Sequence, residues 1–98
     1  MSVVIIGGNE CMARQYKELC SDYNCDAKVF CKMRDGLKNK LGSPKLMILF
    51  TNTTSHKMVR FALNEVKGGN TVIERSHSSS ISALRNILDK HVSERSYV

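Results

Sequence analysis

Apolar residues gather in four short runs along the chain, and each run is followed by polar residues and then by a segment with helical periodicity. The runs predict strands at residues 2–6, 27–31, 45–51 and 71–74. The first and third runs are almost continuously apolar, a pattern typical of strands that are buried on both faces of a sheet. We therefore expect these two strands at the centre of a parallel sheet.

The segments between the apolar runs have the three-to-four-residue spacing of amphipathic helices. Asn9 is a suitable N-cap for the first helix, and Gly42 and Pro44 end the second. The polar stretch 52–55 supplies N-cap candidates for the third helix, and the serine-rich stretch 76–80 leads into the fourth. The predicted helices cover residues 10–22, a short segment through 37–41, a segment from about 56 to 67, and 81–92.

Four alternations of strand and helix predict a single α/β domain over residues 1–92, followed by a frayed C-terminal tail at 93–98. Right-handed crossovers between parallel strands place helices on both faces of the sheet. The expected fold is a small doubly wound, Rossmann-like or flavodoxin-like domain with a four-stranded parallel sheet. Strand order 2-1-3-4 puts the two most apolar strands in the middle.

The chain has 98 residues, and its 15 Lys and Arg against 9 Asp and Glu give a formal net charge of +6. Such a surface attracts anionic ligands. The basic residues are scattered without interleaved aromatic side chains, so nucleic acid is not an expected partner. No apolar run approaches the roughly 20 residues of a membrane span, and no secretory signal is apparent. We therefore expect a cytoplasmic protein that does not insert into membranes.

Four cysteines lie in the first third of the chain, and their spacing matches neither a zinc site nor a C-x-x-C redox pair. They are Cys11, Cys20, Cys25 and Cys31. We expect reduced thiols that act as small apolar side chains.

The carboxyl ends of the predicted strands gather most of the chemically useful side chains. In open parallel sheets, ligands bind at this edge, near the point where the strand order reverses. Helix N-termini at the same edge favour anions. The candidate ligand-binding residues are Gly8, Asn9, Asn52, Ser55, His56, Arg75, His77, Ser78 and Ser79.

Known catalytic and nucleotide-binding patterns are absent from this edge. Gly7-Gly8 lacks the third glycine of a dinucleotide-binding turn, and no lysine-bearing phosphate loop is present. No acid is stationed beside a nucleophile and base, so an enzyme is not expected. His56 directly follows a predicted helix cap, where the helix dipole disfavours imidazolium, so its neutral ring is available as an acceptor or metal ligand.

Three segments together resemble a bacterial family known as domain of unknown function 2325, over nearly the whole chain. They are residues 3–9, the Thr54-Ser55-His56 step and residues 75–80. Family members commonly carry an aspartate near the Ser-His pair, where this chain has Asn52. Many also carry a histidine and glycine after the second strand, where this chain reads Cys31-Lys32, which puts any function of that histidine in doubt.

The resemblance implies binding of haem b, with gas or redox sensing or oxygen binding as its use. His56 is then the axial iron ligand, basic residues pair with the propionates, and Met47, Met58 and Phe61 give apolar contacts. Cys11 is an outside candidate for the sixth ligand. Haem is large for this domain, so the resemblance also implies a homo-oligomer that shares the pocket.

Two alternatives from other classes remain open. One is a regulatory module that holds a phosphate or nucleotide on the helix N-termini near Asn9, Ser55 and Ser78. The other is an interaction domain without a small ligand, which assembles through a sheet edge or its last helix.

Overall fold

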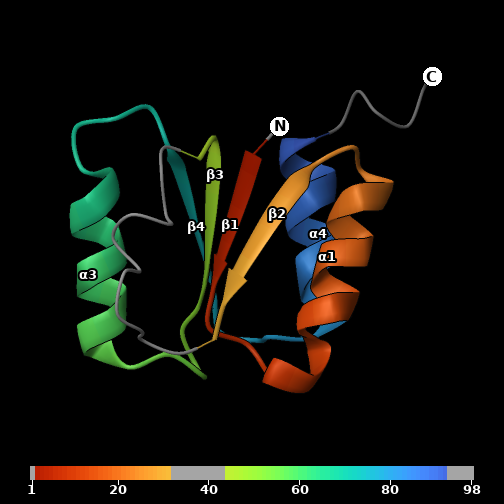
Figure 1. The fold of residues 1–98 in the computed structure, drawn as a ribbon, viewed down its shortest axis with the longest axis horizontal. Helices are drawn as coiled ribbons and strands as arrows, with labels where there is room; N and C mark the ends of the chain where they lie inside the picture. Colours follow the sequence, from red (N-terminus) through yellow and green to blue (C-terminus); the bar gives the residue numbers. More distant parts are fainter. Residues whose placement is uncertain (1, 32–43, 93–98) are drawn as a thin grey trace.

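The computed structural model describes residues 2–31 and 44–92, and it shows one parallel sheet between layers of helices (Figure 1). The elements are β1 (Ser2–Ile6), a short 3-10 turn η1 (Glu10–Met12), α1 (Ala13–Asp22), β2 (Asp26–Phe30), β3 (Leu46–Phe50), α3 (His56–Val66), β4 (Val72–Ser76) and α4 (Ile81–His91). The small doubly wound α/β fold predicted from the sequence is confirmed.

All neighbouring strands of the sheet are parallel, in the order β2-β1-β3-β4. This is the predicted order. Val3 pairs with Leu46 at the start of the two central strands, and Leu46 in turn pairs with Val72. The five residues of β3 are all buried, whereas β4 at the edge contains no buried residue.

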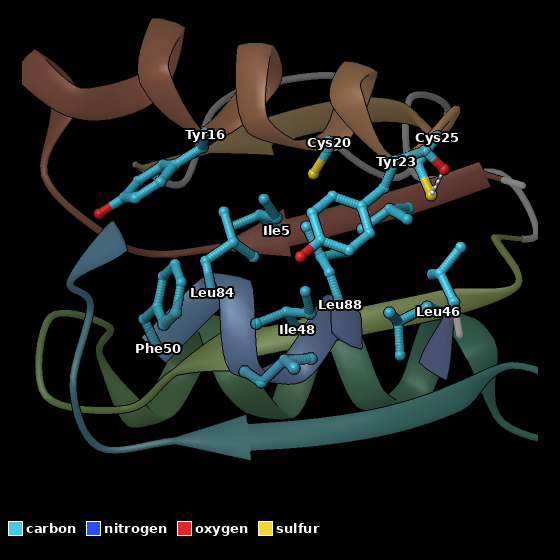
Figure 2. Packing of buried hydrophobic residues seen from close by; sticks show 13 residues of the cluster. Ile5, Tyr16, Cys20, Tyr23, Cys25, Leu46, Ile48, Phe50, Leu84 and Leu88 are labelled. Atoms are coloured by element: carbon cyan, nitrogen blue, oxygen red, sulfur yellow. Dashed lines mark hydrogen bonds between the residues drawn. The ribbon is translucent and has the colours of Figure 1, made fainter. Parts of the chain in front are cut away.

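Two apolar cores lie on opposite faces of the sheet. Alternate residues of β1 and β3 face α1 and α4, where a larger cluster includes Ile5, Ile48 and Leu88 (Figure 2). The intervening residues, such as Ile6 and Leu49, face α3 and form a smaller cluster with Met58 and Ala62. This alternation follows from the two-residue period of a strand and fixes which face each site residue can reach.

The geometry at the C-terminal end of α1 explains why Cys20 and Cys25 are buried. The Cys25 N–H donates to the Cys20 carbonyl at 2.9 Å, and the Asn24 N–H donates to the Ser21 carbonyl at 2.9 Å. Asn24 has a φ of 58°, so this pattern is a Schellman motif with Asn24 in the left-handed position. Cys20 and Cys25 occupy the two positions that normally carry apolar side chains there, and both are buried.

The two helices on the larger core are tied together by tyrosine hydroxyl groups. Tyr16 of α1 donates to the Ser79 carbonyl just before α4, at 2.6 Å. Tyr23 donates to the Asp89 carboxylate of α4. Both rings are buried (Figure 2), so each hydroxyl needs a partner inside the fold.

The boundaries of two predicted elements differ from the structure in small ways. The helix predicted at 10–22 begins as a 3-10 turn and becomes α-helical only at Ala13. The fourth strand extends to Ser76, because Thr51 N–H donates to the Ser76 carbonyl at 2.9 Å and continues the ladder. Arg75 therefore lies in β4 rather than in a loop. The helix predicted through 37–41 and the tail at 93–98 lie outside the described residues.

Candidate functional site

The carboxyl ends of β1, β3 and β4 lie at one edge of the sheet, at the bottom in Figure 1. Helices α3 and α4 begin at this edge. Ser55 caps α3 by accepting from the Met58 N–H at 3.2 Å. Ser80 caps α4 by accepting from the Ala83 N–H at 3.1 Å. The predicted convergence of loops and helix N-termini at this edge is therefore present.

The turn after β1 is bound to the turn after β3 by two threonine hydroxyl groups. The Gly8 N–H donates to Thr53 Oγ1 at 2.7 Å. Thr54 Oγ1 lies 2.8 Å from the Phe50 carbonyl and 3.3 Å from the Ile6 carbonyl, so it bridges the two central strands where they end. Neither threonine is among the candidate ligand-binding residues predicted from the sequence. The sequence signal for this contact is a threonine pair that closely follows β3, the strand beside β1 and its Gly7-Gly8 turn.

Both glycines in this turn are required by geometry. Gly7 and Gly8 have φ of 94° and 87°, in the region that side chains rarely adopt. A Cβ atom on Gly7 would lie 1.8 Å from Thr54 Oγ1, and one on Gly8 would lie 2.7 Å from Tyr16 Cε2. The chain's own side chains therefore occupy the space beside the turn where a dinucleotide-binding protein would admit its ligand.

The serine loop before α4 is also held by internal hydrogen bonds. Ser76 Oγ donates to the Ser78 carbonyl at 2.6 Å, and Ser78 Oγ contacts Ser80 Oγ at 3.1 Å. The Ser79 carbonyl accepts from Tyr16. Asn9, the remaining candidate near β1, accepts from the Cys11 N–H at 2.9 Å through its side chain. These polar groups shape the loops, so most of the predicted candidates have a structural role.

His56 differs from these residues, because it is exposed and its ring makes no hydrogen bond to a described residue. It is the first residue of α3 and directly follows the Ser55 cap. Asn52, Arg75 and His77 are also exposed at or near this edge. The ring nitrogens of His56 are therefore available to a ligand that approaches the carboxyl edge from solvent.

The donor chemistry of His56 fits a haem iron, whereas two of the three expected apolar contacts do not. Met47 and Met58 are 0% and 3% exposed and belong to the core beneath α3. The expectation that they contact haem is wrong, because their side chains already fill the space between α3 and the sheet. Phe61 is partly buried against the same core and keeps some exposed surface. Over residues 2–31 and 44–92, no group of three His, Cys, Asp or Glu side chains is placed to hold a metal ion by itself.

A cavity of about 510 Å³ lies at the opposite edge of the sheet, where β3 and β4 begin. It is lined by the last residues of α3, the Gly68-Gly69-Asn70 turn, and Pro44, Lys45 and Thr71. Thr71 Oγ1 donates to the Pro44 carbonyl at 2.6 Å and closes one wall. No sequence pattern predicts a cavity here, because ligand sites of doubly wound folds lie at the carboxyl edge.

The cysteines differ strongly in exposure. Burial raises the pKa of the Cys20 thiol to about 12, and the nearby Cys25 adds to the effect. Burial also raises the pKa of Cys25. Both thiols are therefore protonated at neutral pH and are poor metal ligands. Cys11 is exposed in η1, next to the Gly7-Gly8 turn.

Glu74 of β4 forms the best-defined charged contact away from the carboxyl loops. Its Oε2 lies 2.7 Å from His91 Nε2 and 3.5 Å from Lys90 Nζ, both at the end of α4. The hydrogen bond from His91 lowers the pKa of Glu74, and the charge of Lys90 acts in the same direction, while burial opposes them. His91 thus ties the C-terminal end of α4 to the edge strand of the sheet.

None of the helices in the described ranges is long and apolar enough to span a membrane. No curated protein and no solved structure matches the chain. The sequence profile of one family matches residues 2–91, and its description reads "Uncharacterized protein conserved in bacteria (DUF2325)". The chain therefore belongs to the DUF2325 family, as the three sequence segments had indicated.

Proposed function

We propose that this protein is a cytoplasmic, non-enzymatic ligand-binding module that binds haem b through His56 and serves gas or redox sensing or oxygen binding. The observation that carries the proposal is the exposed, unengaged His56 ring at the first position of α3. A neutral imidazole is a common axial ligand of haem iron. When bound, the haem would supply an iron that takes up a diatomic gas or changes its oxidation state.

The residues of the chain have separate roles in this proposal. Ser55 caps α3 and thereby fixes the backbone that carries His56. Arg75, exposed near the end of β4, is available to pair with a propionate. Because Gly8, Asn9, Ser78 and Ser79 are held in internal hydrogen bonds, they shape the edge and do not contact iron. The expected homo-oligomer is part of the proposal, since a second copy would cover a ligand bound at an exposed edge.

The test is an absorption spectrum of the purified protein before and after addition of haem, and again after reduction. We expect a sharp Soret band that shifts on reduction in the wild type, and loss of the band in His56→Ala. His77→Ala is the matched control, because His77 is another exposed histidine near the same edge. A band that survives in His56→Ala contradicts the ligand assignment, and no uptake of haem by the wild type removes the proposal.

The second candidate is a regulatory module that binds a phosphate or nucleotide. It is favoured by one observation: α3 and α4 both begin at the edge where Arg75 is exposed, so helix N-termini and a guanidinium face the same solvent region. This reading predicts thermal stabilisation by phosphate compounds without a visible chromophore. A flat response to inorganic phosphate and to nucleotides excludes it.

A further inference from the structure

The edge strand β4 is exposed on both faces as well as along its free side. Val72 and Ile73 are 47% and 39% exposed, and they are the large apolar side chains that the described part of the chain leaves most open. Val72 pairs with Leu46 and therefore lies on the α1 and α4 face, while Ile73 pairs with Met47 and lies on the α3 face. Neither layer of helices covers the start of this strand.

The backbone of β4 is arranged to accept another strand. The Val72 N–H donates to the Lys45 carbonyl, and the Ser76 carbonyl accepts from Thr51, so even-numbered residues point their backbone groups toward β3. Because these directions alternate along a strand, Ile73 and Arg75 direct their N–H and C=O groups away from the sheet. An edge that combines free backbone groups with exposed apolar side chains is a template for strand addition.

We propose that β4 pairs antiparallel with β4 of a second copy, so that two four-stranded sheets join into one sheet across a twofold axis at Ile73. In this register Ile73 faces Ile73 of the partner subunit in a hydrogen-bonded pair. Val72 then lies opposite the partner's Glu74, and Thr71 lies opposite the partner's Arg75. The outward-facing backbone groups of residues 71, 73 and 75 are all matched.

The charges of β4 favour the register with the axis at Ile73 over the register with the axis at Glu74. A twofold axis at Glu74 would overlap all five residues of β4, but it would place the two Glu74 carboxylates directly opposite each other. Like charges in that position destabilise a strand pair. With the axis at Ile73, an apolar pair occupies the centre and no like charges face each other. The interface is thus complementary to itself, which a twofold contact requires.

This dimer is separate from the haem proposal and from the shared pocket expected there. Antiparallel pairing of β4 sends the two carboxyl edges, and both His56 residues, to opposite ends of the joined sheet. The two copies therefore do not share a ligand across this interface. Dimerisation through β4 does not depend on haem.

The test measures the mass of the ligand-free 98-residue chain by sedimentation equilibrium over a wide concentration range. We expect a monomer–dimer equilibrium in the wild type. Ile73→Lys, which places two ammonium groups opposite each other, should raise the dimer dissociation constant about tenfold or more. Ile73→Thr, which keeps the β-branched shape, should raise it less. Asn86→Lys adds the same charge at an exposed position of α4 and should leave dimerisation unchanged.

Two further readouts separate this interface from other assemblies. Each copy carries a net charge of +6, so added salt should strengthen a dimer that is held by backbone hydrogen bonds and apolar contact. Ile73→Lys should keep its haem uptake, and His56→Ala should keep its dimer. A wild-type monomer at all concentrations overturns the proposal, and so does a dimer that Ile73→Lys leaves intact while circular dichroism shows a folded variant.

Discussion

The carboxyl and amino edges of the sheet differ in how tightly the loops and side chains around them pack. At the carboxyl edge, threonine hydroxyl groups bind the turn after β3 to the end of β1, and the Tyr16 hydroxyl binds the loop after β4. Side chains also fill the space beside the Gly7-Gly8 turn. At the amino edge, a cavity of about 510 Å³ remains between α3 and the starts of β3 and β4. The parallel topology decides where loops and helix N-termini gather, but the side chains in those loops decide whether room is left for a ligand.

The glycines of the two edges allow the sharpest test of this difference. Gly7 and Gly68 both have positive φ, but a Cβ on Gly7 meets Thr54 Oγ1, whereas a Cβ on Gly68 meets nothing within 4 Å. Gly68→Ala should lower the free energy of unfolding by about 1 kcal/mol, the cost of the left-handed backbone alone. Gly7→Ala should lower it by about 3 kcal/mol or more, because steric overlap adds to the same strain. Urea denaturation of both variants checks this, and equal losses would mean that the carboxyl edge is not tightly packed.

Removing single hydroxyl groups should produce a smaller difference in the same direction. Thr54→Val loses the hydroxyl group that bridges the Ile6 and Phe50 carbonyls at the ends of the two central strands. We expect a loss of about 1 kcal/mol. Thr71→Val is the matched control at the amino edge, where the hydroxyl bonds the Pro44 carbonyl beside the cavity and water can replace it. Thermal unfolding should show a larger decrease in Tm for Thr54→Val, and the reverse order would contradict the comparison.

The charged contact between β4 and the end of α4 should give the wild type a specific dependence on pH. Because His91 and Lys90 lower the pKa of Glu74 below its ordinary value of 4.5, the contact stabilises the fold fully above that value. The stabilisation is lost as pH falls from 4.5 through the lowered pKa. Glu74→Gln should therefore be less stable at neutral pH by less than about 1 kcal/mol, since the pair is partly solvated. The difference should vanish in acid, and an unchanged difference across the acid range would exclude this contact as its cause.

The smallest effect concerns the thiols at the two edges. Cys11 near the carboxyl edge is exposed, whereas Cys25, directly before β2, is buried and has a raised pKa. A thiol reagent should modify Cys11 in the native state much faster than Cys25, and mass spectrometry of the peptides locates the label. Cys11→Ser should change stability by no more than about 0.5 kcal/mol. Rapid native labelling of Cys25 would show that the end of α1 opens readily.

The comparison also shows how far the sequence predicts this molecule. Continuous apolar runs are sufficient to identify β1 and β3 as central strands, because only a strand covered on both faces can consist of such residues. The pattern does not predict the extension of β4 to Ser76, because Glu74, Arg75 and Ser76 carry no apolar signal and are ordered by pairing with β3. The pattern of apolar residues along a sequence predicts buried strands, and β4 contains no buried residue.

At the site, the sequence located the edge but not its internal contacts. Residue type and position were enough to place His56 at the start of a helix, where the structure has it exposed. The contact of Gly8 with Thr53 joins residues 45 positions apart. A single sequence does not reveal such a pairing, because both residues are common in turns for purely local reasons. A single sequence also does not reveal that Met47 and Met58 are buried, because a methionine suits a core as well as a ligand pocket.

The strand order described above also has a consequence for the time course of folding. β3, α3 and β4 are consecutive in the chain, and the pairing of β3 with β4 joins Leu46 to Val72, 26 positions apart. Pairing of β1 with β3 joins Val3 to Leu46, 43 positions apart, and therefore requires a longer loop to close. Contacts distant in sequence slow folding, so the unit from β3 to β4 is expected to form early and the docking of β1 to limit the rate. The threonine bridge between the ends of the two central strands would then be one of the last contacts made.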